Sequence, residues 1–305
     1  AEYMGEKGRL PMISVVFFPA VRITTSLSNS KLPSSFPNSA SIPHSPHPIS
    51  PRIHVNQAPK TSTKAMLNQS PIISDLYAFA FSASLSVAIL RVTEETARRN
   101  IFSRTTNRKV LHVAIGLAFM ACWPLFYPGH RGAILACLIP GVQVVRMLLI
   151  GSGLWKDEFA VMSISRFGKK RELLGGPLFY CMAITLVCAL CWISPVSIGV
   201  ICNLCAGDGF ADIIGRQFGK VKLPYNVEKS VVGSLAMVVC GYLSSVGYMM
   251  YFTKMGMIEG SPNMALGLLV VSLVCAIVES LPVGAKFDDN LTVPLTALAL
   301  GTLLF

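Results

Sequence analysis

Eight long apolar segments in succession constrain this chain more than any other feature. A helix needs about 20 apolar residues to cross the hydrocarbon core of a bilayer, and most of the segments approach that length. They span residues 72–90, 110–127, 132–153, 176–193, 195–214, 231–252, 264–282 and 291–305. The last is short enough to be only half-inserted. The core of a soluble protein can supply one such helix but not eight in a row. The sequence therefore predicts an all-α polytopic membrane helix bundle of about seven to eight transmembrane helices.

Composition agrees with this fold class. Only 13% of the 305 residues are charged, whereas a soluble domain carries roughly 25%, and the mean hydropathy is +0.58. The net charge of +11 falls in the N-terminal segment and in short loops, which indicates membrane topology and no nucleic-acid partner. The nine cysteines all lie in apolar stretches, so we interpret them as small buried hydrophobic residues and not as a disulfide framework.

Residues 1–70 differ from the rest of the chain. No Asp or Glu occurs between Pro11 and Ser74, and Ser, Thr, Pro and Asn dominate, with scattered Lys and Arg. This composition is typical of a plastid or mitochondrial transit peptide, although an ordinary disordered tail would look similar. We therefore predict a disordered leader over 1–70, which contributes nothing to catalysis, and a membrane domain over 71–305.

The loops between the segments carry unequal charge. Alternate numbering puts loops 91–109, 154–175, 215–230 and 283–290 on one side of the membrane, together with nearly all the Lys and Arg of the domain. The opposite loops carry only Arg131 and Lys254. By the positive-inside rule, the basic loops face the cytosol or, in a plastid membrane, the stroma.

Chemistry concentrates directly after the fifth segment. Asp208 and Asp212 stand four residues apart, which places them on one face of a helix. Carboxylates bind hard cations, while ammonium groups, hydroxyls and the backbone near glycines bind phosphates. The neighbouring glycine, basic and hydroxyl residues are candidate phosphate-binding groups: Gly207, Gly209, Arg216, Lys220, Lys229, Ser230, Gly233 and Ser234. The stretch therefore predicts a site for a magnesium-bound polyphosphate.

The same stretch does not match the usual nucleotide motifs. Between Gly215 and Gly219 there are three residues where a Walker A loop has four, and Val221 stands where Ser or Thr follows the lysine. Packing of small residues between helices is the alternative explanation, because Ala211, Gly215 and Gly219 recur at fourth positions. Packing accounts for the glycines but not for two acids beside an apolar segment.

Further candidates lie in the same membrane layer. His112, near the start of the second segment, is either a satisfied interfacial residue or a catalytic one. Arg171, in a basic loop, carries either a topology signal or a phosphate contact. Glu279 lies near the end of the seventh segment, where acids are costly and usually functional, so it is a third candidate metal ligand. Asp289 forms an acidic pair with Asp288 that would suit a second metal or a catalytic role.

Several of these stretches together resemble one family. They are Arg108-Lys-Val-Leu-His112, Arg171-Glu-Leu-Leu-Gly-Gly-Pro177, Ile201-Cys-Asn-Leu-Cys-Ala-Gly-Asp-Gly209, Lys222-Leu-Pro-Tyr-Asn226, Glu279-Ser-Leu-Pro282 and Asp288-Asp-Asn-Leu-Thr292. From about Arg108 to the C-terminus the chain resembles the plant polyprenol kinases, the chloroplastic farnesol and phytol kinases, and looks most like the farnesol kinases. Dolichol kinases and CDP-diglyceride synthetases are more distant kin. In these the residue before the glycine matching Gly233 is typically an acid, whereas here it is Val232.

The resemblance implies an alcohol phosphotransferase. A nucleoside triphosphate, typically CTP, would donate a phosphoryl group to farnesol, geranylgeraniol or phytol taken from the membrane lipid. On this reading Asp208 and Asp212 bind Mg²⁺, Lys229 and its neighbours hold phosphates, and His112 or Asp289 orients the hydroxyl. The expected location is a chloroplast membrane, and no obligate protein partner is indicated.

Other functions share parts of this pattern. A phytol kinase differs only in its preferred alcohol. A CTP-dependent lipid cytidylyltransferase would use the same metal and nucleotide residues but release pyrophosphate. A transporter would also have many spans and intramembrane acids, but its acids would be expected at the midplane between inverted repeats.

Overall fold

The computed structural model describes residues 71–282 and 288–305, so the predicted leader lies outside the described residues. Within them, seven helical segments are long and apolar enough to cross a membrane, and an eighth, α10, is a shorter apolar helix. The predicted all-α polytopic bundle is therefore confirmed. All nine cysteines are free thiols.

Ten α-helices and several short elements make up the described chain. The first half contains α1 (Pro71–Arg98), α2 (Arg104–Ala121), η2 (Trp123–Leu125), α3 (His130–Ser152), α4 (Glu158–Ile164), η3 (Lys170–Leu174) and α5 (Gly176–Leu190). The second half contains α6 (Pro195–Cys202), η4 (Asn203–Gly207), α7 (Asp208–Phe218), β1 (Lys222–Leu223), β2 (Asn226–Ser230), α8 (Val231–Lys254), α9 (Pro262–Ser280) and α10 (Asp289–Leu304).

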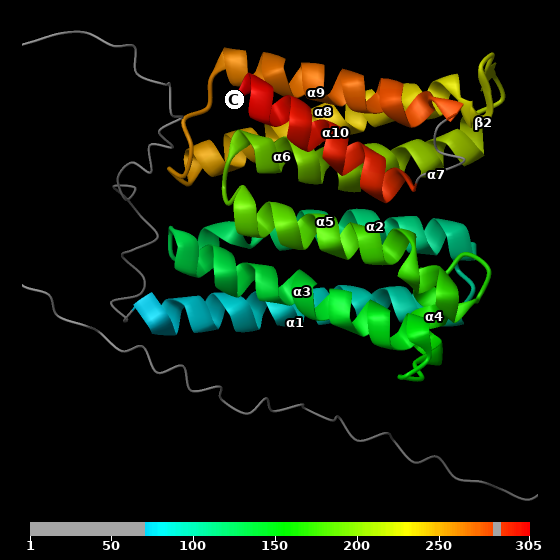
Figure 1. Cartoon of the computed structure of the whole chain (residues 1–305), viewed down its shortest axis with the longest axis horizontal. Helices are drawn as coiled ribbons and strands as arrows, with labels where there is room; N and C mark the ends of the chain where they lie inside the picture. Colours follow the sequence, from blue (N-terminus) through cyan, green and yellow to red (C-terminus); the bar gives the residue numbers. More distant parts are fainter. Residues whose placement is uncertain (1–70, 283–287) are drawn as a thin grey trace, which may run out of the picture. The chain divides into compact units, whose positions relative to one another are not determined.

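The two halves of the sequence form two neighbouring groups of helices. In Figure 1, helices α6 to α10 lie together above and α1 to α5 lie together below. Helix α10 packs against α5 as well as α6 and α9, so it joins the groups. The β1–β2 hairpin and helix α4 lie at the same end of the long helices (Figure 1). This is the end to which the basic loops belong.

The fifth segment is one continuous helical path with a π-helical turn in its middle. Helix α6 passes through the π-turn η4 into α7, which ends at Phe218 and not at the predicted residue 214. The turn is held by Asn203, whose side-chain amide donates to the Gly199 carbonyl at 2.8 Å. A side chain at Gly241 of α8 would collide with Asn203, so glycine is needed there. Such π-turns cluster at functional sites, and this one ends directly at Asp208.

Aromatic packing fixes the end of α2 that lies away from the hairpin. Trp123 is fully buried, and its ring lies 4.7 Å from that of Trp192 and 6.2 Å from that of Phe252. Large apolar rings contribute most of the packing energy at such points. This end of the bundle is therefore closely packed around aromatic rings, with an ion pair between the buried Asp75 and Arg131 nearby, and most of the Lys and Arg lie at the other end.

Arg146, a cation within the third span, pairs with an acid outside the span. Its guanidinium donates to Asp157 at 2.7 Å, and Asp157 also accepts from the backbone N–H of Ala160 at 2.9 Å as the N-cap of α4. Partial burial alone would raise the pKa of Asp157, but these hydrogen bonds and the charge of Arg146 hold it below its usual value. The pair anchors α4 to α3.

Replacing Asp157 with alanine is expected to destabilise the protein by about 1–3 kcal/mol, because it removes a helix cap and leaves a partly buried guanidinium without its carboxylate. Thermal unfolding in detergent measures the effect. Glu158→Gln, at the exposed next position, is the matched control and should change stability by a few tenths of a kcal/mol. Equal unfolding temperatures for Asp157→Ala and the control would contradict this account.

Candidate active site

A cavity of about 660 Å³ opens where α7, the hairpin and the adjoining ends of α8, α9 and α10 meet. Its volume lies within the range of about 300–1,000 Å³ usual for small-molecule sites. The lining is mostly polar and mixes both signs of charge: Arg108, Lys109, Arg166, Arg216, Lys222 and Lys229 face Asp208, Asp212, Glu228, Glu279, Asp288 and Asp289. A largely apolar bundle thus contains a charged cavity at its basic-loop end.

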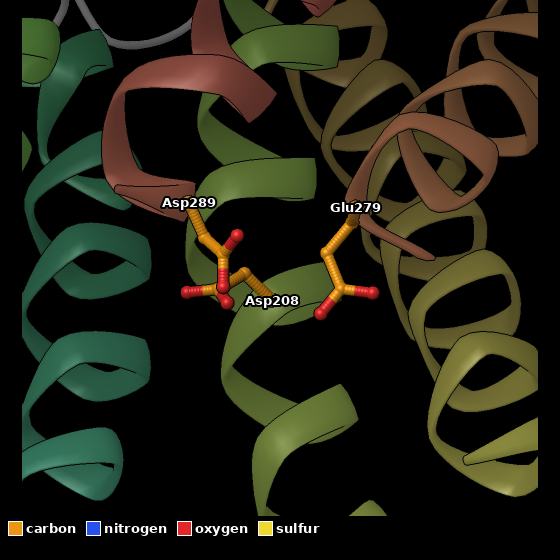
Figure 2. Close-up of side chains that lie close together, drawn as sticks. All are labelled: Asp208, Glu279 and Asp289. Carbon is orange, nitrogen blue, oxygen red and sulfur yellow. The ribbon is translucent and has the colours of Figure 1, made fainter. Parts of the chain in front are cut away.

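Three carboxylates converge in this cavity. Figure 2 shows Asp208, Glu279 and Asp289 pointing toward one another from three different helices, α7, α9 and α10. One oxygen from each lies within 4.8 Å of the others. Asp208 and Glu279 are buried, and buried like charges at this spacing are stable only with compensating cations. Convergent carboxylate oxygens are the ligands that Mg²⁺ prefers, so the donor set fits such an ion.

Two lysines accompany the three acids. Lys109 of α2 donates to Asp208 at 2.6 Å, and both side chains are almost fully buried. Lys229 of β2 donates to Glu279 and, at 3.0 Å, to Asp289. Burial alone would lower the pKa of Lys229, but the two carboxylates outweigh it and raise the pKa above its usual range. Lys229 therefore stays positively charged beside the acids.

His112 of α2 lies beside Asp208. Its Nε2 is 2.8 Å from the carbonyl oxygen of Leu204 and 3.4 Å from Asp208. A carbonyl oxygen only accepts, so Nε2 carries the proton and, in the neutral ring, Nδ1 is an acceptor. Tyr180 lies beside the imidazole, with ring centroids 4.1 Å apart, and donates to the His112 carbonyl at 2.7 Å. These contacts hold the ring in one orientation.

The first turn of α8 forms another wall of the cavity. Ser230 caps this helix by accepting from the Gly233 N–H at 3.2 Å. A Cβ at Gly233 would lie 3.1 Å from the Ala211 carbonyl oxygen and 3.3 Å from the Gly215 Cα, so glycine lets α8 start directly against α7. The N-terminus of a long helix favours anions, and here it lines the charged cavity beside Lys229.

Four buried polar atoms of the cavity lining make no hydrogen bond within the described part of the chain: Arg108 Nε, Asp212 Oδ2, Ser234 Oγ and Asn290 Oδ1. Well over 90% of buried polar groups in native proteins are hydrogen-bonded. A cluster of unsatisfied donors and acceptors in one charged cavity therefore indicates a polar ligand that completes them.

The structure gathers most of the predicted site residues but groups them differently. Asp212 lines the cavity one helical turn after Asp208, yet it pairs with Arg216 at 2.9 Å. Asp212 is not one of the three convergent carboxylates. The acids that converge with Asp208 are Glu279 and Asp289. Arg216, Lys229, Ser230, Gly233 and Ser234 all line the cavity.

Five predicted residues are outside the described lining of this cavity, and one of them, His112, still lies 3.4 Å from Asp208. Among the described lining residues, Arg171 and Lys220 do not appear. Gly207 packs against Met237 of α8, and Gly209 against Val113 of α2, so the packing explanation accounts for both glycines.

Sequence reasoning missed the role of Lys109, which it treated only as a topology charge. The available signal was its spacing: Lys109 and His112 are three residues apart at the start of an apolar helix, which places both on the face that meets Asp208. Arg108 and Asn290 were likewise not singled out.

Fold and site together define a polytopic membrane protein with a carboxylate- and lysine-lined cavity at one end of its helices. Curated relatives identify the family. The chain is 52% identical over 240 residues to a protein of Glycine max named "Probable phytol kinase 3, chloroplastic", covering 78% of this chain and 75% of that protein. It is 48% identical over 258 residues to "Farnesol kinase, chloroplastic" of Arabidopsis thaliana, covering 84% of each. It is 34% identical over 220 residues to "Phytol kinase 1, chloroplastic" of Arabidopsis thaliana, covering 72% of each.

The chain therefore belongs to the plant polyprenol kinase family, which comprises the farnesol and phytol kinases. No family model matches it, and no solved structure does.

Proposed function

We propose that this protein is a prenyl alcohol kinase that transfers a phosphoryl group from a nucleoside triphosphate, with CTP as the expected donor, to farnesol or a related alcohol such as geranylgeraniol or phytol. The single observation that carries the proposal is the charged cavity at one end of the membrane helices, with two buried carboxylates, a third half-buried one and Lys229 beside the start of α8. The names of the relatives, farnesol kinase and phytol kinase, support the same reaction class.

Phosphoryl transfer depends mainly on positioning and on stabilising charge. In this proposal Lys229, Ser230, Ser234 and the first-turn backbone of α8 hold the triphosphate. Arg108, whose Nε is buried without a partner, adds a further donor. Asp208, Glu279 and Asp289 would hold Mg²⁺, which supplies neutralisation of phosphate charge when bound. Asp212 forms an ion pair with Arg216 and so keeps the guanidinium of that arginine at the cavity wall.

The acceptor hydroxyl is placed by His112. The alcohol oxygen forms a new bond to the γ-phosphorus while the bond between that phosphorus and the β–γ bridging oxygen breaks. The nucleoside diphosphate leaves, and the hydroxyl proton passes to the unprotonated ring nitrogen of His112. The Leu204 carbonyl, at Nε2, and the neighbouring Tyr180 ring hold the imidazole in one orientation.

The proposed location is a chloroplast membrane, with the basic loops and the charged cavity facing the stroma. Seven apolar spans and the word "chloroplastic" in the names of the relatives support it, and residues 1–70 would serve as the import signal. A charged cavity at one end of the helices, and not at their midpoint, favours an enzyme over a transporter.

Product analysis tests the proposed reaction. The purified protein, in lipid nanodiscs with Mg²⁺, is expected to convert farnesol and CTP into farnesyl monophosphate and CDP. Phytol, geranylgeraniol and ATP in the same assay give the substrate preferences. Release of pyrophosphate, with a cytidylylated lipid as the product, would instead show a cytidylyltransferase. Absence of any phosphorylated alcohol under all combinations would reject the kinase proposal.

A further inference from the structure

A second cavity, apolar and of about 70 Å³, lies within the membrane bundle beside the charged one. Its walls come from helices α1 to α5 and the start of α10, and include the buried side chains of Leu90, Leu111, Met147, Ile164 and Tyr180. Away from this floor the lining becomes half-buried at Gln143, Pro177 and Cys181. This half-buried part of the lining, called the edge below, lies on α3 and α5.

The two cavities share two lining residues at their polar ends. Arg108 and Asn290 line both of them, and each has a buried atom that lacks a hydrogen-bond partner in the described chain. His112 lines the apolar cavity, while its Nε2 lies 3.4 Å from Asp208 of the charged one. These residues could therefore contact the polar end of a molecule whose apolar body lies against the apolar lining of the second cavity.

We propose that this cavity binds the first isoprene unit of the acceptor alcohol, with the hydroxyl at the Arg108–His112–Asn290 junction. The inference rests on the proposed function and adds the binding site of the acceptor. A cavity of about 70 Å³ has room for a handful of heavy atoms, not for a chain of fifteen carbons. The remainder of the alcohol passes the half-buried edge toward the lipid, so the protein recognises the hydroxyl end of its substrate and not its full length.

Filling the edge of the cavity tests this assignment. Cys181→Trp places an indole at the half-buried opening on α5. It is expected to raise the KM for farnesol about 10- to 100-fold, as the loss of a snug apolar contact does, while the KM for CTP changes by less than about twofold. Cys240→Trp is the matched control: Cys240 is also half-buried, but it lies on α8 and outside the described lining of both cavities. It should leave both KM values within about twofold.

Photolabelling of the wild-type protein gives a second readout that does not depend on turnover or on a folded variant. A prenyl alcohol with a diazirine in its first isoprene unit is expected to label peptides of α2, α3 or α5, and excess farnesol should suppress the label. Labelling confined to α8 or α9, or an unchanged farnesol KM in folded Cys181→Trp, would overturn the inference while leaving the kinase proposal intact. Labelling at α2, α3 or α5 by a protein that phosphorylates no alcohol would retain the cavity assignment and reject the kinase proposal.

Discussion

Replacing Asp208 with asparagine is expected to lower the rate of phosphoryl transfer by about 100- to 1,000-fold or more, the loss usual when a charged group that stabilises a transferring phosphate is removed. Asp208 is the most buried of the three convergent carboxylates. It is also the one that contacts both Lys109 and His112. Asp208 therefore contacts two residues of α2, one of which is the residue proposed to place the acceptor hydroxyl, and is also an expected metal ligand.

The same substitution also has a structural cost. Asparagine leaves Lys109 as a buried cation without its carboxylate, which destabilises a protein by about 3–5 kcal/mol. The double variant Asp208→Asn with Lys109→Met removes both charges and should recover much of the lost stability but none of the activity. Thermal unfolding and turnover per folded molecule, measured together, separate the two effects. If folded Asp208→Asn turned over at near the wild-type rate, Asp208 would have only a structural role.

Asp212 provides the comparison on the same helix. The sequence alone predicts that Asp208→Asn and Asp212→Asn each nearly abolish phosphorylation, because both acids are expected to bind Mg²⁺. In the structure, Asp212 pairs with Arg216, so its replacement is expected to cost less activity than replacement of Asp208.

Replacing Lys229 with methionine is expected to lower kcat/KM for the nucleotide by about 100- to 1,000-fold. Lys229 is the cation that touches Glu279 and Asp289 and lies directly before the cap of α8. Methionine keeps the apolar stem but removes the ammonium group. Without it the two carboxylates lack their compensating charge, so Mn²⁺ should bind the nucleotide-free variant more tightly than the wild type.

Lys222→Met is the matched control, because Lys222 lies on the partner strand β1, lines the same cavity and is exposed. It should alter kcat/KM far less, since an exposed charge is screened by solvent. Normal turnover by Lys229→Met, or weaker Mn²⁺ binding than in the wild type, would contradict the role given to Lys229.

The sequence predicts the fold well because each transmembrane helix is encoded locally. Length and hydropathy mark the spans, and the one-sided basic loops support the number of spans. The departures depend on distant contacts. The π-turn at Asn203 depends on a glycine of α8 that lies against it. The β1–β2 hairpin, in which Lys222 pairs with Ser230, interrupts a predicted loop.

The site is only partly encoded in local spacing. Asp208 and Lys229 stand out in one stretch, and Glu279 and Asp289 stand out as acids at the membrane boundary. These four side chains meet because α7, β2, α9 and α10 pack together. Local periodicity does not specify this packing. For the same reason, helix spacing pairs Asp208 with Asp212, whereas the tertiary fold pairs Asp208 with Lys109 and Asp212 with Arg216.

The most direct test of the central claim is anomalous diffraction from crystals of the protein grown with Mn²⁺ and a non-hydrolysable CTP analogue. The account predicts an anomalous peak bounded by Asp208, Glu279 and Asp289, with the triphosphate of the analogue along Lys229 and the first turn of α8. A peak elsewhere in the protein, or a nucleotide bound outside this cavity, would contradict it.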